Sequence, residues 1–421
     1  MDQNDFQNEP VQKTSRGTIR VPLGVFIICI LLTGVFVFMA TYVPLSLARK
    51  QEVDAAYGRF SKFEKLIELA ELYDEKYLYT VDKDLLDEAL TSAYVYGNGD
   101  RFSYYYTAEE WLAEVATSAG NSVGIGVYII FNPEEGLQVV QVMKDSPAKK
   151  AGVQIGDIIT AIDGIKVLEA GYETAVGMVS GEIGTDVVLT VLRGGETLDI
   201  TITRGTYVPE TVYGEILEVQ GKKLGYVYIT EFMSVAVTAN QFKDTVRLLM
   251  NSGAEGLVFD VRDNPGGDLN AICSILDYLL PAGPIVHISY ADSDEVTTME
   301  SDPSEIDLPM VVLTNGQTAS AAELFTSALR DYEKAETVGH TTYGKGCGQV
   351  GEMLSDGSVV FLTNFLYSPP FSENYDGVGI VPDHEVSLSE EWQNKNLFLI
   401  PHNEDDQLIK AVEVLLSSIS N

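Results

Sequence analysis

The chain has 421 residues, of which 45% are hydrophobic, and carries 62 acidic against 27 basic side chains, for a formal net charge of −35. That length is too great for one ordinary core, so two or three domains are expected. Because the surface is strongly acidic and offers no broad basic patch, binding to nucleic acid is excluded.

A membrane anchor is expected near the N-terminus. Leu23 to Val43 form 21 consecutive positions without a charge, which is long enough to cross a bilayer as a helix. The alternative is a cleaved signal peptide, because Ser46-Leu47-Ala48 resembles a cleavage site, but the apolar stretch exceeds the usual roughly 7 to 15 residues. We therefore expect a tail at 1–22 and an uncleaved transmembrane helix with its flank at 23–48. Basic residues lie on both sides of the span, so charge does not orient it.

A helical region is expected at 49–115. Its apolar residues recur at helical spacing in two stretches, formed by Phe60, Phe63, Leu66, Ile67, Ala70 and Leu72, and by Leu85, Leu86, Ala89 and Leu90. Helices beside an anchor pack on their own domain or on a second copy of the chain. A homodimer is therefore one expected partnership.

A β-rich module is expected at 116–206. Its short strand-like runs are VGIGVYII, GLQVVQV, GDIITAIDG, DVVLTVLRGG and LDITITR. Between them, Pro147 to Gly152 predicts one short helix that its glycine ends. Five strands around a small helix are typical of a compact domain.

Strands and helices alternate from Gly225 onward. GLVFDVR precedes a Pro-Gly-Gly turn and the helical pattern LNAICSILDYLL, and MVVLTN precedes AAELFTSALRDY. This alternation predicts a layered α/β core at 207–395, with functional loops at strand ends. The closing DDQLIKAVEVLLSSI is amphipathic and predicts a C-terminal helix within 396–421.

Loop DNPGGD follows the strand GLVFDVR and offers backbone amides to a developing oxyanion. Gly266 or Gly267 would supply one donor, and Ala321 would supply another. Taken alone, the loop is equally an ordinary strand-to-helix turn with Asp268 as the helix cap.

Ser320 lies where an apolar strand gives way to a helix, in TNGQTASAAELF. S-x-x-E before an apolar run is a capping box in which Glu323 would reach back, so a helix cap is the first interpretation. A nucleophile is the second, and it requires a base. Four histidines could serve, but none has a local catalytic signature and no G-x-S-x-G surrounds the serine. They are His287, His340, His384 and His402.

Lys345, in YGKGCGQ, is the alternative base. Gly344 and Gly346 beside it let the backbone turn tightly and approach another segment closely. A lysine acts as a base only where burial lowers its pKa from about 10.4 toward neutral. A solvated loop lysine is the competing interpretation.

Taken together and in this order, NPGGDL, TASAAE, YGKGCGQ, DGVGIVPD and DDQLIKAVEVL resemble the C-terminal processing peptidases, or tail-specific proteases. These are serine peptidases with a PDZ domain and a Ser-Lys dyad, and the likeness runs from about Phe102 to the C-terminus. The resemblance implies an α+β multidomain fold: a transmembrane helix, a helical region, a PDZ β-module and a ClpP/crotonase-like ββα-spiral core. It also implies a single-pass protein of the cell membrane whose catalytic domain is extracytoplasmic.

Carried onto this sequence, the resemblance implies Ser320 as nucleophile, Lys345 as general base and Gln349 as the holder of the lysine head group. Glu323 is given a structural role, because a carboxylate beside Lys345 would raise its pKa. The implied oxyanion donors are Gly266, Gly267 and Ala321. No metal or organic cofactor is implied. Cys347 stands where the family usually has a serine, and an inert buried thiol is expected there.

In the PDZ module, VGIGV matches the family's site for a chain terminus. The residues are Val123, Gly124, Ile125, Gly126 and Val127. Open amides at the glycines would hold a carboxylate, and the peptide would add as a β-strand; a plain Gly-rich turn is the alternative. The expected partners are proteins or peptides with exposed C-termini.

The predicted function is a membrane-anchored serine endopeptidase. Two alternatives stay open: a non-catalytic PDZ scaffold that binds protein C-termini, and a His-dependent serine esterase. Of the three cysteines, Cys29 lies in the apolar span, and the sequence does not show whether Cys273 and Cys347 meet.

Overall fold

A computed structural model describes residues 38–42 and 61–419 of the chain. By its internal contacts the chain divides into two compact units, residues 1–83 and 84–421. The described part of the first unit contains a helical stretch at 38–42. It also contains the 3-10 helix η1 (Ser61–Phe63) and the helix α2 (Glu64–Lys76).

The membrane anchor is not tested by this structure. Within the described ranges, no helix is both long and apolar enough to span a bilayer. The transmembrane helix expected at 23–43 lies outside the described residues, apart from 38–42. The helical region expected after it is confirmed, because α2 and α3 (Lys83–Tyr96) occupy the two stretches with helical spacing.

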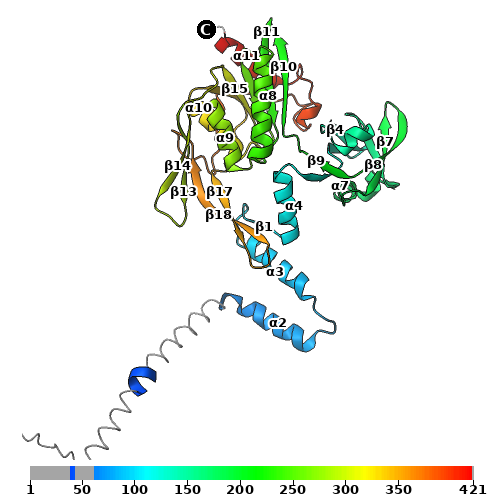
Figure 1. Cartoon of the computed structure of the whole chain (residues 1–421), viewed down its shortest axis with the longest axis vertical. Helices are drawn as coiled ribbons and strands as arrows, with labels where there is room; N and C mark the ends of the chain where they lie inside the picture. The colour runs from blue at the N-terminus through cyan, green and yellow to red at the C-terminus, as the bar shows by residue number, and fades with distance from the viewer. Residues whose placement is uncertain (1–37, 43–60, 420–421) are drawn as a thin grey trace, which may run out of the picture. The chain divides into compact units, whose positions relative to one another are not determined.

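A strand and a further helix, which the sequence did not predict, complete the region before the β-module (Figure 1). They are β1 (Tyr104–Tyr106) and α4 (Ala108–Ser118). Helix α4 starts with a complete capping box: the Thr107 hydroxyl accepts from Glu110 N–H at 3.2 Å, and the Glu110 carboxylate accepts from Thr107 N–H at 2.9 Å. This box fixes where the helix begins.

The five strands predicted for the β-module form one antiparallel sheet in the order β3-β4-β5-β7-β8. They are β3 (Val127–Asn132), β4 (Gly136–Val142), β5 (Ile158–Ile162), β7 (Asp186–Arg193) and β8 (Glu196–Thr203). Strand β6 (Ile165–Lys166) pairs with β5, and β2 (Ser122–Gly124) pairs with β9 (Gly205–Tyr207). Among the strands of residues 61–419, β3 has a partner on one side only, β4.

The module's helices are α5 (Pro147–Ala151), α6 (Val167–Ala170) and α7 (Tyr172–Val179). The short helix predicted at 147–152 is α5, and Gly152 ends it at φ 88°, a left-handed conformation that suits glycine. The buried side chains of the strands and helices form a core of the module's own.

The α/β core contains a six-stranded sheet in the order β10-β11-β12-β15-β16-β19. Its strands are β10 (Val212–Val219), β11 (Lys222–Ile229), β12 (Leu257–Asp260), β15 (Met310–Thr314), β16 (Ala335–Gly339) and β19 (His384–Glu385). The β10–β11 pair is antiparallel and the remaining pairs are parallel. The carboxyl ends of β12 and β15 therefore meet at one edge of the sheet.

Helices cover both faces of this sheet (Figure 1). They are α8 (Asn240–Asn251), preceded by the π-helical turn η2 (Val235–Ala239), α9 (Leu269–Leu279), α10 (Ala321–Asp331) and α11 (Asp406–Ile419). Along β12, Leu257 and Phe259 pack with α8, α9 and α10, whereas Val258 packs with α11. A strand buried on both faces explains why this stretch is continuously apolar.

A second sheet in the order β1-β18-β13-β14, with β17 also paired to β18, lies beside this core. Its remaining strands are β13 (Gly283–Tyr290), β14 (Val296–Ser301), β17 (Cys347–Met353) and β18 (Val359–Ser368). A 3-10 turn, η3 (Leu397–Leu399), precedes α11. Because β1 pairs with β18, the segment before the β-module becomes part of the core.

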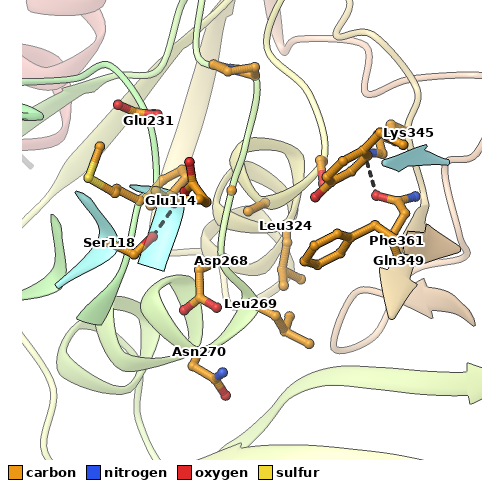
Figure 2. A pocket seen from close by; sticks show the side chains of 18 of the residues that line it. Glu114, Ser118, Glu231, Asp268, Leu269, Asn270, Leu324, Lys345, Gln349 and Phe361 are labelled. Atoms are coloured by element: carbon orange, nitrogen blue, oxygen red, sulfur yellow. Dashed lines mark hydrogen bonds between the residues drawn. The ribbon is translucent and has the colours of Figure 1, made fainter. Parts of the chain in front are cut away.

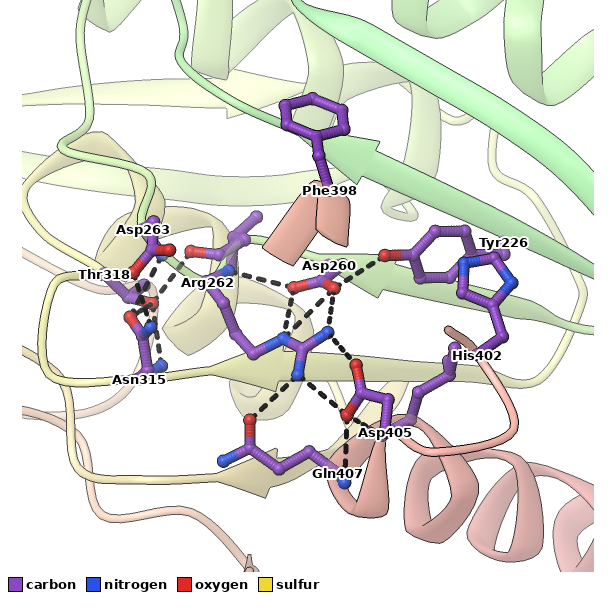
Figure 3. Close-up of polar contacts among 12 residues, drawn as sticks. Tyr226, Asp260, Arg262, Asp263, Asn315, Thr318, Phe398, His402, Asp405 and Gln407 are labelled. Atoms are coloured by element: carbon purple, nitrogen blue, oxygen red, sulfur yellow. Dashed lines mark hydrogen bonds and ion pairs between the residues drawn. The ribbon is translucent and has the colours of Figure 1, made fainter. Parts of the chain in front are cut away.

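Arg262 is the largest fully buried side chain among the described residues, and it lies at the end of β12 (Figure 3). Its guanidinium donates to Asp260 and Asp405, with Nη2 at 2.5 and 2.7 Å from their carboxylates, and to Gln407 at 2.9 Å. Burial alone would lower the pKa of Arg262, but the two carboxylates outweigh it and raise the pKa. This ion cluster joins the start of α11 to the loop that follows β12.

Candidate active site

Ser320 lies at the N-terminus of α10 with φ 55° and ψ −120°, a conformation that non-glycine residues seldom adopt. The turn presents the hydroxyl to a cavity of about 720 Å³, which Ala321, Lys345 and Gln349 also line. Residues held in such strained conformations cluster at functional sites. The serine predicted from the sequence is therefore both the helix N-cap and exposed to a cavity.

Glu323 joins the serine turn to the lysine loop. Its carboxylate is fully buried and accepts from the backbone N–H of Ser320 at 2.9 Å and of Lys345 at 2.8 Å. It also accepts from Gly344 N–H at 2.7 Å and the Thr342 hydroxyl at 2.6 Å. Burial raises its pKa, and the four donors partly offset that shift. The reach-back predicted for the capping box is confirmed, and the same carboxylate also positions the lysine loop.

Lys345 is half-buried, and its Nζ donates to Gln349 Oε1 at 3.1 Å. Nζ also lies 4.8 Å from the ring centroid of Phe102. Burial lowers the pKa of Lys345, and Cys347, Asp100 and Glu323 oppose the shift. Burial thus acts in the direction that a lysine base requires.

The lysine and the serine share one cavity, but Lys345 does not donate a hydrogen bond to the Ser320 hydroxyl in this structure. Tyr367 Oη lies within hydrogen-bond distance of that hydroxyl, at 3.5 Å. Catalytic hydrogen bonds are often long in unliganded enzymes and tighten when substrate binds. The side chain of Lys345 therefore has to move from Gln349 toward the serine before it can act as a base.

The three predicted oxyanion donors differ in availability. Gly266 N–H donates to Asn264 Oδ1 at 2.9 Å, so it is already occupied. Within residues 61–419, the N–H groups of Gly267 and Ala321 have no acceptor. Gly266 has another role: a Cβ there would lie 2.7 Å from the Cβ of Ser320, so only glycine allows this approach. Gly267 and Ala321 are thus the pair free to hold an oxyanion.

Two buried tyrosines, which the sequence analysis did not identify, support the site. Tyr367 Oη donates to the Lys345 carbonyl at 2.7 Å, and Tyr375 Oη donates to the Ser320 carbonyl at 3.4 Å. Burial raises the pKa of both phenols, so both stay protonated donors. Tyr367 comes from β18 and Tyr375 from the loop after it, and nothing in the local sequence assigns either side chain to the site.

The cavity combines aromatic walls with acidic groups (Figure 2). Glu114 and Glu231 lie across it from Lys345, which is the only basic residue among the described residues that line it. Burial raises the pKa of Glu231, and the nearby Glu114 adds to the shift. The aromatic lining residues come from β1, α4 and the second sheet, and are Tyr104, Tyr106, Trp111, Tyr290, Phe361, Phe365 and Tyr367, together with Phe232.

All four histidines lie away from the serine cavity, and none lines it. His287 contacts Thr298 and the carbonyl of Pro370, and the other three face glutamates; these are His340, His384 and His402. A histidine base is therefore not supported. Cys273 and Cys347 are buried free thiols that do not pair, and burial raises the pKa of each.

Of the predicted peptide-binding residues, only Val127 belongs to the edge strand β3 of the β-module. Val123 and Gly124 belong to β2, which already pairs with β9, and Ile125 is buried in the module's core. Val127 starts β3, whose outer edge has no partner strand among the described residues. The N–H groups of Ile125 and Gly126 have no acceptor within residues 61–419. A peptide can therefore add to β3 with its carboxylate near these amides.

Comparison with known proteins covers both modules. The model for "Peptidase family S41" matches residues 223–386, and the model for "PDZ domain" matches residues 121–203. A protein of Staphylococcus saprophyticus, "Probable CtpA-like serine protease", is 30% identical over 366 residues, covering 85% of this chain and 72% of that protein. A protein of the same description from Staphylococcus epidermidis is 29% identical over 427 residues, covering 99% of this chain and 84% of that protein.

The fold is also shared with a solved structure, a candidate S41 protease from Bacteroides fragilis. The two have a TM-score of 0.53 at 20% identity, over 72% of this chain and 87% of that one. At this identity the likeness concerns the fold alone. The S41 match spans β11 to β19 and includes the loops that carry Ser320 and Lys345.

Proposed function

The chain belongs to peptidase family S41, as a CtpA-like C-terminal processing protease with a PDZ domain, and on that premise we propose a specific function. It is a membrane-anchored endopeptidase that binds the C-terminal tails of protein substrates through the PDZ domain. It hydrolyses peptide bonds with Ser320 and Lys345 as a dyad. The observation that carries this proposal is that both side chains line one cavity, while Glu323 holds their two backbone segments together.

In the proposed mechanism, neutral Lys345 accepts the proton of the Ser320 hydroxyl as the oxygen attacks the peptide carbonyl. The N–H groups of Gly267 and Ala321 stabilise the resulting oxyanion. The lysine ammonium then protonates the leaving amine, and a water molecule hydrolyses the acyl-enzyme. Gln349 receives the ammonium group between steps, because its Oε1 already accepts from Nζ.

Substrate capture is assigned to the PDZ domain. An extended tail would pair with the free edge of β3, and its carboxylate would reach the amides of Ile125 and Gly126. The strands and helices of the α/β core, which follows the PDZ domain in the chain, are proposed to form the ClpP/crotonase-like ββα spiral that the family implies.

Cleavage should depend on the end of the substrate. An unfolded protein with an apolar C-terminal tail is expected to be cut with a kcat/KM about tenfold or more above that of the same protein with an amidated terminus, because the amide removes the carboxylate that the loop binds. Initial rates with full-length protein measure this. Equal rates for both substrates would contradict recognition of the C-terminal carboxylate by the PDZ domain, but would not contradict the assignment as a protease.

The membrane location is proposed from the 21 uncharged residues at 23–43, and the outward placement of the catalytic domain comes from the family. The full-length chain is expected to stay in the membrane fraction after alkaline carbonate extraction, whereas the chain starting at Gln51 is released. Release of the full-length chain would contradict the anchor.

A further inference from the structure

Segment 100–103 reaches the catalytic base from a part of the chain that precedes the PDZ domain. Phe102 places its ring centroid 4.8 Å from the Nζ of Lys345. Its own backbone is fixed, because Phe102 N–H donates to the Asp100 carboxylate at 3.0 Å. The ring therefore covers the Lys345 ammonium group, and the hydrogen bond to Asp100 holds the backbone that carries the ring.

A chain of hydrogen bonds links the same segment to Gln349. The Gln349 amide donates to the Thr363 hydroxyl at 3.1 Å, and Thr363 N–H donates to the Ser103 hydroxyl at 3.1 Å. Ser103 in turn donates to Asp100. Burial alone would raise the pKa of Asp100, but hydrogen bonds to its carboxylate, chiefly from Ser103 and Phe102, outweigh burial and lower the pKa. The carboxylate therefore stays charged. Segment 100–103 thus reaches Nζ both through the ring and through the amide that holds it.

We infer that Phe102 is a positioning residue for Lys345: its ring excludes water from the lysine side chain and holds the ammonium group against Gln349. The inference rests on the proposed dyad. It concerns a residue that lies outside the segments matched by the S41 and PDZ models and is far from Lys345 in the sequence.

The ring acts on the lysine in two opposite ways. By excluding water it disfavours the ammonium form, and by offering its π face it favours that form. Other ionisable groups also lie around the lysine: Glu323 from α10, Asp100 from the same segment, the thiol of Cys347 at the start of β17, and Arg101, whose guanidinium lies 4.7 Å from the Phe102 centroid. Two substitutions separate the two effects of the ring.

Phe102→Ala admits water, so the ammonium form is stabilised and the acid limb of the pH–rate profile moves to higher pH. Phe102→Leu keeps the site covered but removes the π face, so the limb moves to lower pH. At a fixed pH on the limb, the Leu variant is expected to react about two- to fivefold faster than wild type, and the Ala variant at least as much slower. A merely structural role would not move the limb in opposite directions.

The measurement is the rate at which a fluorophosphonate phosphonylates the Ser320 hydroxyl, with loss of fluoride, in the full-length protein as a function of pH. This readout needs neither a natural substrate nor the PDZ domain. Tyr105→Leu is the matched control, because Tyr105 lies on β1, directly after segment 100–103, and does not line the cavity. The acid limb of this variant is expected to stay at the wild-type position. Thermal unfolding checks that each variant is folded.

The outcomes distinguish the inference from the function it rests on. Opposite displacements in the two Phe102 variants support the inference. If wild type is phosphonylated and the acid limb is unmoved in both folded Phe102 variants, the inference is overturned and the dyad stands. If wild type is not phosphonylated at Ser320 at any pH, the proposed dyad fails and the inference falls with it.

Discussion

Ser320→Ala and Lys345→Ala are each expected to lower kcat/KM for peptide hydrolysis by about 10⁴-fold or more while leaving the fold intact. The first change removes the attacking oxygen and the second removes the base. Because the two groups act as a unit, the double variant should be about as slow as either single one. Cleavage of an unfolded protein, followed by initial rates, measures all three.

Matched controls in the same helix and on the surface make this result specific. Ser327→Ala changes a serine of α10 whose hydroxyl bonds to the Leu324 carbonyl, and Lys410→Ala removes a surface ion pair with Glu413. Both variants are expected to keep wild-type rates. Activity retained by Lys345→Ala but lost on His340→Ala or His384→Ala would contradict the lysine base and restore the esterase alternative.

The pH dependence follows from the direction of the lysine shift. Lys345 acts as a base only when neutral, so the rate rises with pH through its pKa and falls below it. Burial lowers that pKa, and the rising limb therefore lies at lower pH than the ordinary titration of an exposed lysine. Substitution of Glu323 by Gln would disturb the backbone of both loops as well as the charge.

The parts of the site that lie in loops directly after strands could be predicted from the sequence. Apolar runs predicted β12 and β15, and parallel neighbours place their following loops at one edge, which brings Gly267 and Ser320 together. The availability of individual amides could not be anticipated. That Gly266 N–H is occupied depends on where the Asn264 side chain points, which no local pattern fixes.

Side-chain contacts between segments far apart in the chain could likewise not be predicted from the sequence. Phe102 reaches Lys345 from the segment that leads into β1, which pairs with one end of β18, and Tyr367 reaches Ser320 from the other end of β18, which pairs with β13. The sequence predicted no strand at β1, since three residues carry too little periodicity to identify one. Hydrophobic patterning predicts which elements form, whereas the neighbours of each side chain depend on how those elements pack.

The buried ion cluster of Arg262 is the strongest departure from expectation by residue type, because charged residues are seldom fully buried. Arg262 and Asp260 stand two positions apart at the end of an apolar strand, but their third partner, Asp405, lies 143 residues from Arg262. Tyr226 Oη also donates to Asp260 at 2.8 Å. Every buried side-chain nitrogen or oxygen atom of the described residues has a hydrogen-bond partner, and the two carboxylates of this cluster share the Arg262 guanidinium.

Arg262→Met is accordingly expected to lower the free energy of unfolding by about 3 to 5 kcal/mol, because it leaves two carboxylates buried without a counter-ion. Arg247→Met is the matched control: its pair with Asp244 is largely exposed, so a change of no more than about 1 kcal/mol is expected. Urea unfolding of the chain from Gln51 compares the two. Equal stabilities for both variants would show that the buried carboxylates find other partners.

Replacing all three charged groups by apolar residues separates the cost of an unpaired charge from the worth of the cluster. Arg262→Met combined with Asp260→Leu and Asp405→Leu is expected to recover most of the stability lost by Arg262→Met alone, since no buried charge is left unpaired. Peptidase activity need not return with it. Arg262 is followed within five residues by Gly267, so loss of the cluster frees the loop that carries a proposed oxyanion donor. A triple variant that is stable but slow would show that the cluster serves to position this loop.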